Sequence, residues 1–71
     1  MAAKTLATVT NTNGNVWHVS ATSGQHLIAV TGAEDAIFGP VKASLVADHG
    51  YRDDGEFVRR GPGRYSYVVE E

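Results

Sequence analysis

Arginine and tyrosine gather in one short stretch near the end of the chain, and both could bind nucleic acid or protein. Between positions 59 and 67, three arginines flank a Gly-Pro-Gly turn and two tyrosines follow at alternate positions: Arg59, Arg60, Arg64, Tyr65 and Tyr67. Guanidinium groups form paired hydrogen bonds with phosphates, and tyrosine rings stack on bases. Both residue types are also enriched where two proteins bury a contact. The stretch is a candidate binding hairpin, and a solvated turn with its tyrosines in the core is the structural alternative.

A second polar stretch carries residue types that bind metal ions. It holds four carboxylates and a histidine: Asp48, His49, Asp53, Asp54 and Glu56. With His18 or His26 nearby, these groups could supply mixed nitrogen and oxygen ligands. Their spacing matches neither a zinc site nor the alternating acidic positions of a calcium loop. Because such residues also dominate exposed turns, we expect a solvated turn between positions 48 and 55 and no metal site.

The motifs of common enzymes do not occur in the sequence. There is no cysteine, no Gly-x-Ser-x-Gly elbow, and neither a Walker loop nor the dinucleotide-binding glycine pattern. A chain of 71 residues also leaves little material for a pocket of enzyme size. We therefore expect a protein that is not an enzyme, with no catalytic residues and no cofactor.

Length and composition predict one small domain over residues 1–71 that gains stability by association. The 42% of hydrophobic and 20% of charged residues suit a folded chain. A domain of this size buries only about 60% of the surface that its unfolded chain exposes. Because there is no cysteine, disulfides cannot supplement the core. Contact with another protein, or with further copies of the chain, is the expected supplement.

Charge and apolar patterning limit the range of partners. The apolar runs, such as residues 27–30, are far shorter than the roughly 20 residues that cross a bilayer. No apolar stretch typical of a secretory signal follows residues 1–4, so we expect synthesis in a cytoplasm and no membrane contact. The net charge of −2 gives no general attraction to nucleic acid, which would need a local basic patch. Residues 1–4 are expected to be frayed, and residues 70–71 to form a solvated tail.

Turn residues and alternating side chains predict strands in the first half of the chain. Asn13-Gly14 suits a type I′ turn, which favours a hairpin of residues 4–11 and 15–22. Alternation places Trp17 and Val19 on one face of that hairpin, with His18 and Ser20 on the other, and Trp17 is expected in the core.

The next segments extend this pattern. Residues 25–31 form the third expected strand, and residues 33–38 a loop that carries Ile37 and Phe38 as an apolar anchor. Residues 40–48 fit two structures. Pro40 and Gly50 would bracket a helix of about two turns. Alternation of apolar residues from Val41 to Ala47 favours a strand, which is our prediction.

A second hairpin is predicted for residues 56–60 and 64–70, around the Gly-Pro-Gly turn. Together the segments predict an all-β fold, a small six-stranded antiparallel sandwich or barrel, with a short helix at 40–48 as the alternative.

Three segments, SGQHLIAVTG (23–32), GPVKASLVAD (39–48) and DGEFV (54–58), resemble small β-sandwich proteins of tailed bacteriophages. In those proteins a strand of the form G-x-V-x-L-x-x-S/A-D leads to a strand of the form D-G-x-W/F-V. The resemblance implies a head decoration, head-fibre or tail-associated protein. Such a protein is made in the host cytoplasm, is located in the virion, and binds a capsid or tail protein lattice in many copies.

The expected function is therefore that of a non-catalytic structural or interaction protein. Its partner is a protein lattice or further copies of the same chain in a homo-oligomer. The candidate partner-binding residues come from the loop and the hairpin: Ile37, Phe38, Arg59, Arg60, Arg64, Tyr65 and Tyr67. The alternative is a small β-barrel that binds nucleic acid through the same arginines and tyrosines. The sequence leaves open the partner, the oligomeric state, the strand order and the choice between head and tail.

Overall fold

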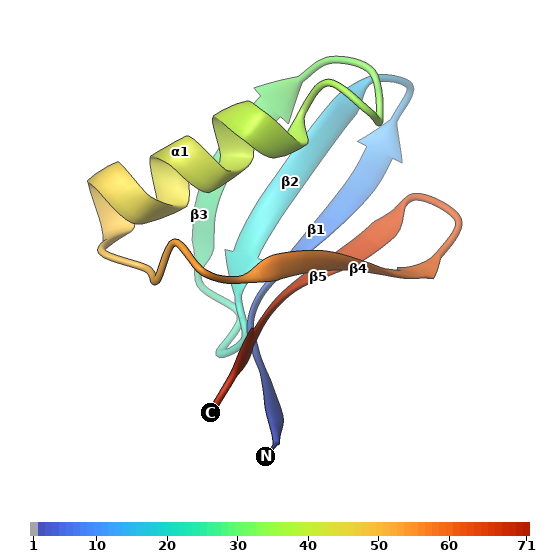
Figure 1. Ribbon diagram of the computed structural model, residues 1–71. Coiled ribbons are helices and arrows are strands. Elements are labelled where there is room, and N and C mark those ends of the chain that lie inside the picture. Colours follow the sequence, from blue (N-terminus) through green and yellow to red (C-terminus); the bar gives the residue numbers. More distant parts are fainter. Residues whose placement is uncertain (1) are drawn as a thin grey trace.

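The computed structural model describes residues 2–71, which form a five-stranded antiparallel sheet with one helix against it (Figure 1). The elements follow in the order β1 (Ala3–Asn13), β2 (Val16–Ala21), β3 (His26–Thr31), α1 (Phe38–His49), β4 (Glu56–Gly61) and β5 (Arg64–Glu70). Across the sheet the strand order is β3-β2-β1-β5-β4. The predicted mostly-β class is confirmed. The six-stranded sandwich or barrel was wrong, because the sheet is single and open.

Both predicted hairpins are present. Gly14 and Gly63 have φ angles of 62° and 66°, the left-handed conformation that tight hairpin turns require. The second hairpin, β4–β5, joins the first through antiparallel pairing of β5 with β1, so β1 lies at the centre of the sheet. The third predicted strand is also confirmed, as β3 at one edge.

The two ends of the described chain lie side by side (Figure 1). Ala3 pairs with Glu70, and the Lys4 ammonium lies 3.6 Å from a carboxylate oxygen of Glu71. The prediction of a frayed segment at 1–4 was therefore wrong for residues 3 and 4, because pairing with β5 satisfies their backbone groups. Met1 lies outside the described residues.

Residues 40–48 belong to helix α1, so the strand predicted there was wrong, and the alternative of a short helix that ends before Gly50 is confirmed. Val41 and Leu45, one helical turn apart, are fully buried. The apparent alternation depended on Ala43 and Ala47, which are exposed in the helix. Alanine is the best helix former and is small enough to face solvent, so its position in an alternating pattern carries little information. Gly50 ends the helix with a φ of 72°.

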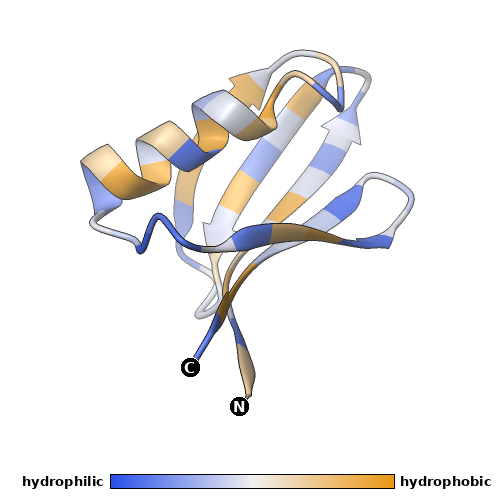
Figure 2. Cartoon of the chain, in the orientation of Figure 1, coloured by the Kyte–Doolittle hydropathy of each residue, from blue (hydrophilic) through white to orange (hydrophobic). Residues whose placement is uncertain are grey.

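The core lies between α1 and one face of the sheet, here called the helix-covered face. Its members come from the strands, the loop before α1, and α1 itself: Ala7, Val9, Trp17, Val19, Ile37, Val41, Leu45, Tyr67 and Val69. Trp17 is buried as predicted, and its indole N–H donates a hydrogen bond to the Gly32 carbonyl at 3.0 Å. Figure 2 shows apolar and polar positions alternating along β1 and β2.

The opposite face of the sheet, here called the uncovered face, carries no second layer within residues 2–71 (Figure 1). It is lined by polar side chains from the central strands, among them Thr8, Thr10, His18 and Ser20. The predicted separation of His18 and Ser20 from Trp17 and Val19 is confirmed. Helix α1, the only helix within residues 2–71, has 12 residues and is too short to cross a membrane.

Candidate protein-binding pocket

The residues of the predicted Arg–Tyr hairpin lie on opposite faces of the sheet. Tyr65 and Tyr67 face α1, with Tyr67 fully buried and Tyr65 partly buried. Ser66, between them, points to the uncovered face, where its hydroxyl accepts a hydrogen bond of 3.1 Å from the Arg60 guanidinium. Alternation along β5 places Arg64 on that face as well. A single ribbon that combines all the arginines with both tyrosine rings therefore does not form.

Tyr67 attaches the connection between α1 and β4 to the sheet. Its hydroxyl donates a hydrogen bond to the Arg52 carbonyl and accepts one of 3.2 Å from the Gly55 backbone N–H. A Cβ atom on Gly55 would lie 2.5 Å from the Tyr67 ring, so only glycine fits at this position. Ile37, another predicted contact residue, is 1% exposed. Both Ile37 and Tyr67 are core residues of the isolated chain.

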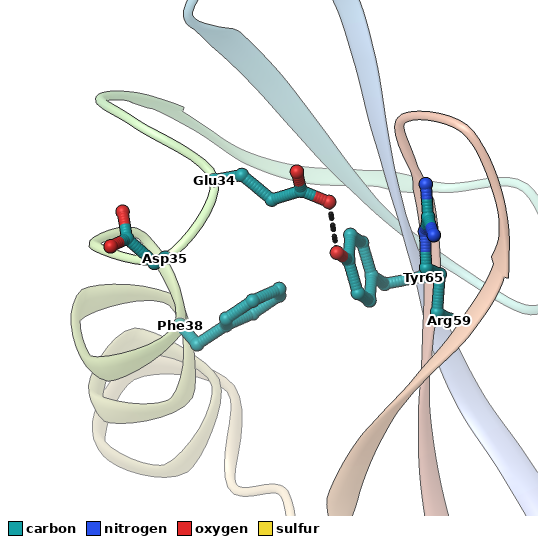
Figure 3. Close-up of a pocket in the computed structure, with 5 residues that line it drawn as sticks. All are labelled: Glu34, Asp35, Phe38, Arg59 and Tyr65. Carbon is teal, nitrogen blue, oxygen red and sulfur yellow. Dashed lines mark hydrogen bonds between the residues drawn. The ribbon is translucent and has the colours of Figure 1, made fainter.

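Three other predicted contact residues come together around one surface pocket of about 500 Å³ (Figure 3). Phe38 is the first residue of α1, Arg59 lies in β4 and Tyr65 in β5. The pocket is completed by Glu34 and Asp35 from the loop between β3 and α1. Side chains from four separate segments therefore surround one opening, which faces solvent.

Aromatic packing fixes the apolar wall of this pocket. The Phe38 ring meets Tyr65 edge-on at a centroid distance of 4.7 Å and lies 4.8 Å from Phe57. On its other side Tyr65 contacts Trp17 at 6.1 Å. Such pairs add about 0.5–1.5 kcal/mol each beyond simple burial. The wall is therefore continuous with the core and is preorganised for contact.

One hydrogen bond joins the acidic wall to the aromatic wall. The Tyr65 hydroxyl donates to a carboxylate oxygen of Glu34, 31 residues earlier in the chain. This bond, supported by burial and by the negative charge of Glu34, raises the pKa of Tyr65 above its ordinary value, against a smaller opposite effect of Arg59. Tyr65 is accordingly a neutral hydrogen-bond donor at physiological pH. The pocket thus presents two carboxylates, two aromatic rings and one guanidinium.

Sequence reasoning missed Glu34 and Asp35. The acidic pair lies far in sequence from Arg59 and Tyr65, and only the position of α1 brings the segments together. With 40–48 predicted as a strand, nothing placed residues 34–35 beside the second hairpin. Recognition of the helix would have supplied the signal, because the loop before a helix that crosses the sheet must approach the strands beneath it.

The polar stretch from Asp48 to Glu56 is mostly exposed, as predicted, but the turn is shorter than expected, because Asp48 and His49 belong to α1 and Gly55 is buried. Its main interaction is a two-pronged contact from the Arg52 guanidinium to Asp54, at 3.0 and 2.6 Å. The hydrogen bond from Arg52 lowers the pKa of Asp54 below its ordinary value. No group of three or more potential metal ligands comes together anywhere in residues 2–71.

Comparison with known proteins identifies no relative. No protein-family model matches the chain, and no curated protein or solved structure is significantly similar to it. These comparisons therefore give no support to the resemblance to phage virion proteins, which stays an expectation from the sequence.

Proposed function

We propose that the chain is a non-catalytic interaction protein that binds a basic segment of another protein in the pocket between α1 and the β4–β5 hairpin. The observation that carries this proposal is the meeting of Glu34 and Asp35 with the rings of Phe38 and Tyr65 around one opening. A carboxylate beside two aromatic rings matches the two parts of a long basic side chain.

A lysine or arginine of the partner would use both walls. Its aliphatic stem packs against Phe38 and Tyr65, and its cationic head reaches the Glu34 carboxylate beside them. Asp35, whose side chain points away from the rings (Figure 3), adds negative charge at the edge of the pocket. Arg59, on the far side of Tyr65, attracts a carboxylate or carbonyl of the partner and repels a second positive charge (Figure 3). The preferred partner segment therefore has one basic residue followed or preceded by an acidic or neutral one.

A repeated protein lattice is one partner of this kind. On the resemblance drawn from the sequence, the lattice is a phage capsid or tail, and the protein is a virion decoration, fibre or tail-associated protein present in many copies. The small core of a 71-residue chain contributes little stability, and association with a partner would add to it.

Amide chemical-shift mapping tests the pocket. A short peptide with a central lysine, Ac-Gly-Lys-Glu-NH₂, is expected to shift the signals of Glu34, Phe38 and Tyr65, whereas the same peptide with glutamine for lysine is not. The double variant Glu34→Gln/Asp35→Asn should bind the lysine peptide more weakly, because it keeps the shape of the pocket and removes its negative charge.

Asp53→Asn is the matched control, since it removes one exposed carboxylate outside the pocket. Equal binding by the double variant and by the wild type contradicts the proposal, and so do lysine-peptide shifts that map elsewhere. Co-sedimentation with assembled phage capsids then tests the lattice: retention by the wild type and loss in the double variant support it.

The nucleic-acid alternative receives no specific support from the geometry. Tyr65 and Tyr67 face α1, whereas Arg60 lies on the uncovered face with Ser66. The rings that would stack on bases are thus separated by the sheet from that guanidinium. This alternative stays a prediction, and salt-sensitive binding of single strands is its test.

A further inference from the structure

Two histidines lie side by side on the uncovered face, across the sheet from the pocket. His18 Nδ1 in β2 and His26 Nε2 in β3 are 3.3 Å apart. The ring centroids are separated by 5.4 Å and the ring planes are tilted by 57°, so the rings meet at their nitrogen edges and do not stack. Both residues belong to strands that pair directly, which holds their backbones next to each other.

The separation of the two nitrogens matches that of two ligands on one metal ion. Zinc binds imidazole nitrogen at about 2.0–2.1 Å with tetrahedral geometry, which places two nitrogen ligands about 3.3–3.4 Å apart. The free protein already holds the pair at 3.3 Å. Little movement of the strands is therefore needed for both nitrogens to contact one ion.

The proton balance of such a site is simple. In the free protein, one ring donates its N–H to the lone pair of the other. A metal ion takes a lone pair from each of these nitrogens, so the donor ring carries its proton on its other nitrogen instead. When both imidazoles are neutral, no proton leaves the protein.

The surroundings favour nitrogen ligation by the two rings alone. The neighbouring side chains on this face are hydroxyls, such as Ser20 opposite His26 and Thr10 opposite His18. The three strands β1, β2 and β3 contain no aspartate or glutamate. Imidazole nitrogen suits zinc, copper and nickel, whereas calcium and magnesium sites usually include carboxylates, which these three strands lack.

We propose that His18 and His26 form a two-histidine binding site for a divalent transition-metal ion of the zinc class. The protein supplies two ligands through His18 Nδ1 and His26 Nε2, and water fills the remaining positions. Those positions are accessible from solvent, because His26 is exposed at the start of β3. The site is independent of the proposed pocket, which lies on the helix-covered side of the sheet.

Titration of the full chain with zinc chloride tests this site. Calorimetry and imidazole nitrogen shifts should show one ion per chain, with shifts at His18 and His26 and none at His49. His18→Gln and His26→Gln should each weaken binding about tenfold or more, because a second ligand held at a fixed distance strongly raises the affinity of the first.

His49→Gln is the matched control, since this third histidine lies at the end of α1, away from the pair. It should keep the affinity of the wild type. Zinc should raise the melting temperature of the wild type and of His49→Gln, and not that of His26→Gln. Unchanged imidazole signals at about 1 mM zinc, a concentration that detects even weak binding, would overturn the proposal. An equal zinc affinity in a folded His26→Gln variant would do the same.

Discussion

The hydrogen bond between Tyr65 and Glu34 is the residue contact on which the shape of the pocket depends. It connects the loop before α1 to β5 over 31 positions of the chain. Neither residue is exceptional by itself in the sequence. Tyr65 was among the residues predicted to bind a partner, whereas Glu34 was not. At the scale of the residue, the sequence identified the aromatic half of the pocket and missed the acidic half.

Ionisation of Tyr65 should weaken this contact at alkaline pH. The pKa of Tyr65 is raised in the folded protein, so the bond contributes fully below the unfolded value of about 10 and is lost as the pH rises through the folded pKa. Phenolate absorbance and tyrosine ring shifts would follow the titration. Glu34→Gln should lower the pKa of Tyr65 toward its ordinary value, because the negative neighbour is removed. A titration of Tyr65 that is the same in both proteins would contradict this assignment.

The connection between α1 and β4 depends on one close approach between elements. Gly55 lies against the ring of Tyr67, whose hydroxyl also bonds to the Arg52 carbonyl and to the Gly55 N–H. Gly55→Ala forces the ring or the loop to move, and overpacking of this kind costs about 1–3 kcal/mol. We therefore expect a lower free energy of unfolding, measured by chemical denaturation with circular dichroism.

Gly39→Ala provides the contrasting substitution. Gly39 lies in the first turn of α1, and a Cβ atom there would meet no other atom within 4 Å. Alanine restricts the unfolded chain, but its Cβ also meets the ring of the following Pro40 in the helical conformation, so a net change of less than about 1 kcal/mol is expected. If Gly55→Ala unfolds at the same denaturant concentration as the wild type, the close approach to Tyr67 is not a constraint in solution.

Element by element, the strands could be predicted from the sequence, whereas the helix was only the alternative to a strand. Each hairpin combines a glycine turn with side chains of period two, and the two signals agree. In residues 40–48 the signals conflict, since Pro40 and Gly50 mark a helix and the alternating apolar positions suggest a strand. Ile37 and Phe38 belong to the helical pattern with Val41 and Leu45. When the segment is taken to begin at Pro40, Ile37 and Phe38 are left out and the helical spacing of apolar residues is no longer visible.

For the whole molecule, the single helix determines the architecture. A strand at 40–48 would have supplied the sixth member of a closed or two-layered β structure. As a helix, this segment instead leads from edge strand β3 to β4 at the opposite edge and covers one face on the way. The strand order therefore could not be derived before the helix was known. The sheet is left open, with a polar second face.

A circularly permuted chain should fold to the same structure. The Glu71 backbone N–H donates a hydrogen bond of 3.0 Å to the Ala2 carbonyl, so a short glycine-serine linker can join residues 71 and 2. New ends can be opened between Pro62 and Gly63, in the exposed turn of the second hairpin. We expect the amide spectrum of the permutant to match that of the wild type outside these two regions. An unfolded permutant would contradict this expectation and indicate that the closed β4–β5 turn is needed for stability.

The meeting of β1 and β5 at their outer ends also has a mechanical consequence. A force applied through residues 2 and 71 acts on the outermost antiparallel pairs and separates them one at a time, which is the unzipping geometry. Shearing, by contrast, would load all the pairs between β1 and β5 together. The fold should thus yield to a small pull applied through its two ends.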